Sequence, residues 1–166
     1  MKKKNFGNPT KKNFLMALPD TAFENKGIPH RCKFNFSFFD HSQEAGQNFN
    51  DWDHNSLVKL LEKLKHYSNE NLEHWRHARC GAGGLTIYEN YKNSPNKSDF
   101  IHPKHVPHNV EWARFRLEQK VRLIGFVLPK ECENIIDTAC HLTYDPNTFF
   151  VVFLDQDHRF YNIETE

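Results

Sequence analysis

Two apolar-rich stretches in the second half of the chain are separated by only three residues. They are VEWARFRL (110–117) and VRLIGFVLP (121–129), with EQK (118–120) between them. Three residues are short enough for a β-hairpin, although this loop lacks the favoured Asn-Gly pair and any Gly. A turn at Asp145-Pro146 then leads into a further apolar run, FFVVFL (149–154), which predicts a closing strand. We therefore expect a mainly antiparallel sheet.

Upstream and downstream of the hairpin, periodicity predicts one more strand and three helices. Phe34, Phe36 and Phe38 alternate with polar residues, as in a half-buried strand. Leucines at helical spacing follow Asp53 and Asn55, either of which can cap a helix. The predicted elements are a strand at 33–40 and helices at 51–68, 69–80 and 131–142.

This order of elements predicts an α+β fold, a mainly antiparallel sheet with two helices packed on one side. Residues 31–166 form one domain in this interpretation. Residues 1–30, with five lysines in the first dozen positions, are predicted to be a basic, poorly ordered arm, either solvated or touching phosphates. Residues 85–110 stay ambiguous, because Gly, Pro and Asn punctuate them.

Composition sets bounds on the class of protein. The formal net charge is +1, so no overall field points to a polyanionic partner, and local clusters must carry such an argument. No stretch approaches the roughly 20 apolar residues that span a bilayer, and the start lacks the apolar region of a secretory signal. The four cysteines show no paired framework. We expect a cytoplasmic protein with free thiols, no membrane association and no cofactor.

The closing strand ends unusually. FFVVFLDQDHRFY (149–161) crowds His158, Arg159 and Tyr161 into four positions just after the apolar run. In the hairpin, strand alternation puts Trp112, Arg114 and Arg116 on one face, while Arg122 lies across from them. These are the side chains that we single out for a function.

The hairpin and the closing strand, together with the helical pair at 55–79, resemble the C-terminal sheet of the RelE/ParE toxin superfamily. The ribonuclease branch of that family cuts mRNA on the ribosome. The resemblance covers residues 55–161 and implies a RelE-like fold. It also implies RNA or the ribosome as a partner and a possible antitoxin protein as another. The catalytic residues that it implies are Arg122, His158, Arg159 and Tyr161.

Metal-independent RNA cleavage through the 2′-hydroxyl needs a base, an acid and a cation that stabilises the charged phosphorane. His, Arg and Tyr suit these tasks, and Arg binds phosphate oxygens through two donors at once. A basic face with an aromatic ring also suits single-stranded RNA. The expected RNA-binding residues are Trp112, Arg114, Arg116 and Lys120.

Each of these residues also has an ordinary structural interpretation. Arg114 and Arg116 can be the solvent side of an amphipathic strand. His158 and Arg159 can be turn residues, and Trp112 can be a packing residue. A second function therefore stays open, a non-catalytic RelE-like binding module for a protein or nucleic-acid partner, and the near-neutral charge favours it.

Metal chemistry is the competing alternative. Histidine and cysteine side chains lie close together in sequence at HRC (30–32), HARC (77–80) and CH (140–141). None of these stretches forms the paired knuckle of a structural zinc site. HPKHVPH (102–108) offers three histidines around two prolines. We predict no metal site from these patterns.

Overall fold

The computed structural model describes residues 8–17, 27–133 and 135–161. Its main sheet has five strands in the order β1-β7-β6-β5-β4. All neighbouring strands are antiparallel except β1 and β7, which run parallel. The α+β class and the mainly antiparallel sheet are thus confirmed. The strands are β1 (Lys33–Asn35), β4 (Tyr88–Lys92), β5 (Glu111–Arg116), β6 (Arg122–Val127) and β7 (Thr148–Asp155).

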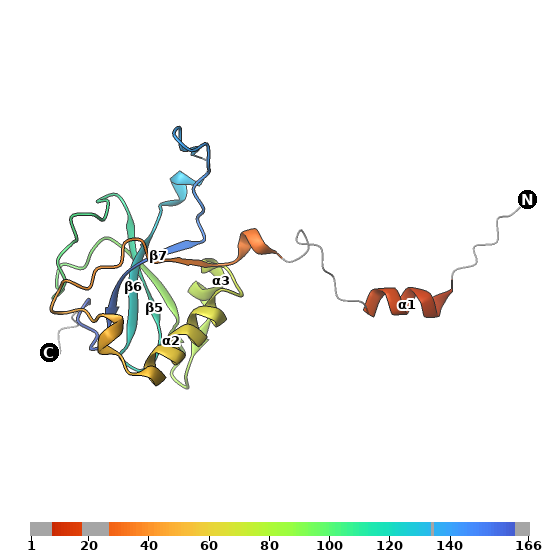
Figure 1. The fold of residues 1–166 in the computed structure, drawn as a ribbon, viewed down its shortest axis with the longest axis horizontal. Coiled ribbons are helices and arrows are strands. Elements are labelled where there is room, and N and C mark those ends of the chain that lie inside the picture. The colour runs from red at the N-terminus through yellow and green to blue at the C-terminus, as the bar shows by residue number, and fades with distance from the viewer. Residues whose placement is uncertain (1–7, 18–26, 134, 162–166) are drawn as a thin grey trace, which may run out of the picture.

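Two helices cover one face of this sheet, α2 (His54–Tyr67) and α3 (Leu72–His77), as Figure 1 shows. The side chain of Asp53 accepts from the backbone N–H of Ser56, so α2 begins at the predicted cap. A core forms between helices and sheet because Leu60, Tyr67 and Trp75 pack against buried residues of β5, β6 and β7. None of the helices in the described ranges is long and apolar enough to cross a membrane.

Loops rather than helices cover the other face of the sheet. A second buried cluster there joins Trp112, Ile124 and Phe153 to loop residues such as Phe100 and Phe160. Its rings lie close together, with Trp112 stacked on Phe153 at 6.1 Å and tilted against Phe160 at 5.2 Å. This loop-covered face carries the candidate site.

Short elements complete the described chain. Helix α1 (Pro9–Ala17) lies in the predicted arm and has no buried residue. Of the arm that we predicted at 1–30, residues 1–7 and 18–26 lie outside the described residues, and residues 28–30 form a 3₁₀ turn. A small antiparallel pair, β2 (Arg79–Cys80) and β3 (Leu85–Thr86), flanks the glycine-rich turn. Three 3₁₀ turns are η2 (Ile28–His30), η3 (Phe49–Asp51) and η4 (Lys130–Cys132).

The predicted strand at 33–40 is wrong beyond Asn35. The Asn35 side chain accepts from the N–H of Ser37, and the N–H of Phe39 donates to the carbonyl of Phe36, so the chain turns there. Phe36 packs with the helix-side core, whereas Phe38 packs with the loop-side cluster. The three alternating phenylalanines therefore do not share one face.

The predicted helix at 131–142 is also wrong. Among the described residues of this stretch, the turn η4 is the only helical element. The Asp137 carboxylate accepts from the backbone N–H groups of Ala139 and Cys140, which competes with helical hydrogen bonds. Ile136 is 57% exposed and Leu142 is 67% exposed. The apolar spacing did not make a helix because these side chains have no surface to pack against.

Candidate functional site

Three arginines lie at one end of the loop-covered face. Arg114 and Arg116 alternate along β5, and Arg116 is paired directly with Arg122 of β6. Arg122 is paired in turn with Asp155 at the end of β7. Since paired residues of neighbouring strands point to the same side of a sheet, these four side chains form one polar cluster beside the aromatic packing.

Arg114 is held by the neighbouring strand β4. Its guanidinium donates to the Glu89 carboxylate, and its Nε donates to the Tyr91 hydroxyl at 2.8 Å. Its Nη1 also reaches the carbonyl of Thr86 at 3.4 Å. Arg114 is only 6% exposed, so these contacts fix it as a paired, buried cation.

Arg116 and Arg122 are held by the hairpin turn. Arg116 Nη1 donates to the Gln119 carbonyl at 3.1 Å, and Arg122 Nη1 donates to the same oxygen at 2.7 Å. The turn is tight, since the N–H of Val121 donates to the carbonyl of Glu118 at 2.6 Å, and Gln119 has a φ of +34°. The unusual backbone of Gln119 thus places one acceptor between two guanidinium groups.

Arg122 is the least satisfied of the three arginines. It is 4% exposed, and its buried Nε has no hydrogen-bond partner among the residues that the structure describes. Burial, together with repulsion from Arg116 and Arg114, lowers its pKa to about 10. A desolvated cation with an unused donor favours an anion beside it.

Asp155 positions the segment that follows β7. This carboxylate is 1% exposed and accepts from the backbone N–H groups of Arg159 at 2.8 Å and Phe160 at 3.0 Å. The resulting turn carries His158 with a φ of +63°. The buried carboxylate therefore determines where His158 is presented.

His158 lies within the electrostatic reach of the arginine cluster. Burial lowers the pKa of its imidazole, and the positive charge of Arg122 lowers it further, while Asp155 acts in the opposite direction. Strand β6, which carries Arg122, pairs directly with β7, the strand that leads into the turn of His158. An imidazole with a lowered pKa is neutral near pH 7 and can accept a proton.

The other two predicted catalytic residues have different surroundings. Tyr161 is 43% exposed and stacks on Tyr91 at 5.3 Å, and the Tyr91 hydroxyl contacts Arg114. Arg159 instead donates through Nε to Asp99 at 2.8 Å, a hydrogen bond that raises its pKa. The structure thus joins Tyr161 to the cluster through Tyr91 and ties Arg159 to the loop that carries Asp99.

The predicted RNA-binding face is largely covered, contrary to our expectation. Trp112 is 3% exposed, and neighbouring rings surround it, so a base cannot reach it without repacking of the core. Arg114 is buried as well, whereas Lys120 is exposed in the hairpin turn. Alternation along the strand was predicted correctly, but no pattern in the sequence indicates that loops cover this face.

Sequence reasoning missed Glu89, Tyr91 and Asp155. The first two lie on β4, within the stretch 85–110 that Gly, Pro and Asn made ambiguous. One signal in the sequence could have indicated Asp155. An acidic residue directly after six apolar ones ends the strand and can accept from the following N–H groups.

The histidine and cysteine clusters take other roles. His102 stacks on His108 at 4.6 Å, while a ring nitrogen of His105 lies 3.1 Å from the Phe38 carbonyl. Cys32 is buried, which raises the pKa of its thiol to about 12. Within 8–17, 27–133 and 135–161, no three His, Cys, Asp or Glu side chains are placed to hold a metal ion.

Comparison with known proteins found no matching family model, no matching curated protein and no matching solved structure. The geometry and electrostatics of the cluster therefore carry the functional argument.

Proposed function

We propose that this protein is a RelE-like toxin ribonuclease that cuts mRNA by metal-independent acid–base catalysis. The observation that carries the proposal is that His158, whose pKa is lowered by burial and then by the charge of Arg122, lies within electrostatic reach of that buried and incompletely bonded cation. A neutral base next to a phosphate-binding cation is what cleavage through the 2′-hydroxyl requires.

In this mechanism His158 takes the proton of the 2′-hydroxyl while the 2′-oxygen attacks the adjacent phosphorus. Arg122, supported by Arg116, stabilises the charge that develops on the phosphorane oxygens. The bond from phosphorus to the 5′-oxygen breaks, and Tyr161 donates a proton to that oxygen. The products are a 2′,3′-cyclic phosphate and a free 5′-hydroxyl.

Burial of the cluster suggests how this activity is controlled. Arg122 is 4% exposed, so a phosphate reaches it only if the covering segments move. We expect free RNA to be a poor substrate and the ribosome to be the productive partner. We also expect an antitoxin protein to hold the enzyme inactive, encoded by a neighbouring reading frame.

The second candidate function is a non-catalytic RelE-like binding module for a protein or nucleic acid. One observation favours it. Arg114 is paired with Glu89, and Arg116 and Arg122 donate to main-chain carbonyls, as arginines do when they only hold a fold together. A net charge of +1 is also low for a nuclease that approaches the ribosome.

Induced expression in a bacterial host separates the two functions. If the protein is a ribonuclease, the wild type should stop growth and His158→Gln should restore it. His54→Gln is the matched control, because His54 is exposed at the start of α2, and this variant should remain toxic. Full toxicity of a folded His158→Gln protein would exclude His158 as the base.

A further inference from the structure

A small lobe between β6 and β7 extends away from the sheet, as the blue segment in Figure 1 shows. The structure describes residues 130–133 and 135–145 of this lobe. Its outer part is a narrow hairpin, in which Ile136 and Thr143 form an isolated antiparallel bridge. The bridge sets the register of the hairpin and therefore determines which side chains share a face.

One face of this hairpin is apolar and exposed. Residues that lie opposite each other in an antiparallel pair point to the same side, and neighbours along a strand alternate. In the register of the bridge, Ile135 lies opposite Tyr144, and Leu142 follows on the same side two positions away. Their side chains are 49%, 39% and 67% exposed, in that order. Three large apolar side chains thus share one face of the lobe and contact water.

A groove with only apolar residues in its walls runs along α2, and its volume is about 370 Å³. Four of its residues are leucines at helical spacing, and two are phenylalanines from the segments that precede the helix. Leu61, at its edge, is 64% exposed. Exposed apolar surfaces of this kind mark contact sites in proteins. The lining residues are Phe36, Phe49, Leu57, Leu60, Leu61 and Leu64.

The lobe and α2 carry opposite charges. The lobe contains four acidic residues and one lysine, whereas α2 contains three lysines and one glutamate. One charge on each is already paired within the chain, through Lys33–Asp145 and Lys59–Glu118. Without these two pairs the lobe still has an excess of negative charge, and α2 still has an excess of positive charge. Complementary charges around two apolar surfaces favour contact between them over contact between like surfaces.

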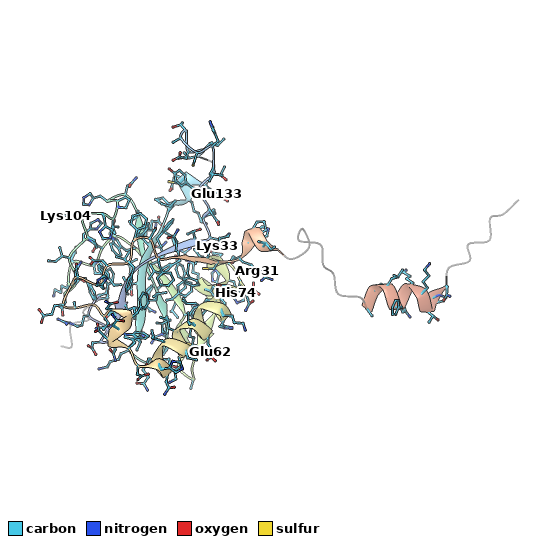
Figure 2. The ribbon with its side chains drawn as sticks, viewed as in Figure 1. Arg31, Lys33, Glu62, His74, Lys104 and Glu133 are labelled. Carbon is cyan, nitrogen blue, oxygen red and sulfur yellow. The ribbon has the colours of Figure 1, made fainter. Side chains whose placement is uncertain are left out.

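The lobe and the groove lie too far apart to meet within one molecule. The lobe ends at the start of β7, whereas the chain two residues before Phe49 of the groove forms a bridge with Leu154, near the end of that strand. A strand of this length extends over about 20 Å. Figure 2 shows Glu133 of the lobe and Glu62 of α2 at opposite ends of the folded domain. A lobe that occupies the groove must therefore come from another copy of the chain.

We propose that the lobe of one copy of this protein docks into the α2 groove of the next copy. The face of Ile135, Leu142 and Tyr144 then covers the leucines of the groove, and the acidic residues of the lobe lie beside the lysines of α2. Because the two surfaces differ, the contact is heterologous, and the assembly runs head to tail into a ring or an open filament. This self-association goes beyond the ribonuclease proposal and does not depend on it.

Analytical ultracentrifugation of the purified full-length protein tests the assembly. The mass of the wild type should rise with concentration beyond that of a dimer, because every copy carries an intact lobe and an intact groove. Leu61→Glu places a negative charge in the groove and should leave a monomer. Combining Ile135→Ser and Leu142→Ser removes the apolar face of the lobe and should also leave a monomer. The matched control is Ile101→Ser, because Ile101 is 77% exposed outside both surfaces, and this variant should assemble like the wild type.

A mixture of the two defective proteins is the most specific test. The Leu61→Glu protein keeps its lobe, and the protein with Ile135→Ser and Leu142→Ser keeps its groove. Mixed in equal amounts, they should form a complex of two chains and nothing larger, because the remaining groove and lobe are disabled. A mixture that stays monomeric would overturn the proposal. A wild-type protein that stays monomeric up to about 1 mM would also overturn it, since a specific contact binds more tightly than that.

Charge reversal on α2 tests whether the acidic lobe is the occupant. Lys65 lies one helical turn beyond Leu61, so Lys65→Glu should raise the dissociation constant by about threefold or more. Glu62→Lys should lower the dissociation constant, because it adds a positive charge to the same helix. Changes in the opposite directions would show that the groove receives a basic surface, and they would overturn the proposal.

Discussion

Arg116 and Arg122 donate hydrogen bonds to the same main-chain oxygen, the carbonyl of Gln119, at 3.1 and 2.7 Å. Two cations are thus held side by side at the end of a sheet, where burial and mutual repulsion lower the pKa of Arg122 to about 10. Arg116 also donates to the Thr86 carbonyl at 3.2 Å and Arg122 to the Val121 carbonyl at 2.9 Å, but the buried Nε of Arg122 has no hydrogen-bond partner among the described residues. Two adjacent cations that are partly removed from water make the cluster a candidate for binding phosphate.

The pKa of His158 should respond to Arg122 but not to Arg116. Burial and the charges of Arg122 and Arg114 lower it, so Arg122→Met should raise it toward the ordinary value of about 6.5. Arg116→Met is the control and should leave it nearly unchanged. NMR titration of the ring protons measures both. An equal response to the two substitutions would place Arg122 away from the ring.

The same shift makes stability depend on pH in a known direction. The folded protein disfavours protonated His158, so its folded pKa lies below the unfolded one. As pH falls through about 6.5, the unfolded state binds the proton first, and stability decreases until the folded pKa is reached. Urea denaturation at pH 7.5 and 5.5 should show a smaller loss for His158→Gln than for wild type.

Asp155→Ala should destabilise the fold strongly. It removes the acceptor of two backbone N–H groups, those of Arg159 and Phe160, in a place where water does not replace it. Loss of hydrogen bonds to a buried charged group predicts a cost of roughly 3 kcal/mol. Asp157→Ala, two residues away and exposed, should change stability by less than about 0.5 kcal/mol. Chemical denaturation compares them, and equal effects would contradict the role of Asp155.

Gly125 should not tolerate even a methyl group. A Cβ at this position in β6 would lie 2.1 Å from the Phe150 carbonyl oxygen and 2.8 Å from the Phe149 ring. Because the nearest atom belongs to the backbone of β7, Gly125→Ala should cost about 3 kcal/mol or more. Gly83→Ala, where no atom lies within 4 Å, should be nearly neutral. Thermal unfolding of the two variants distinguishes them.

Much of the fold could be predicted from local patterns. The leucine spacing and the cap at Asp53 predicted α2, and the gap of three residues predicted the hairpin of β5 and β6. These predictions are correct because each element buries the face that its apolar periodicity defines. The predicted helix at 131–142 failed for the same reason, since Ile136 and Leu142 remain exposed.

The candidate site was only partly predictable. Alternation placed Arg114 and Arg116 on one face, but their burial depends on loops from distant parts of the chain. Arg114 donates to Glu89, which lies 25 residues away in sequence, and Arg159 donates to Asp99, which lies 60 residues away. Such partners are set by tertiary packing, and no local period in the sequence indicates them.

The most direct test of the account is to sequence RNA 5′ ends after brief induction of the protein in bacteria. If His158 and Arg122 form a ribonuclease site, wild type should create new 5′-hydroxyl ends within mRNA coding regions, and His158→Gln should create none. A folded His158→Gln protein that leaves the same new ends would contradict the catalytic assignment. If the wild-type protein leaves no new 5′ ends, the result would contradict the nuclease function and favour the binding module.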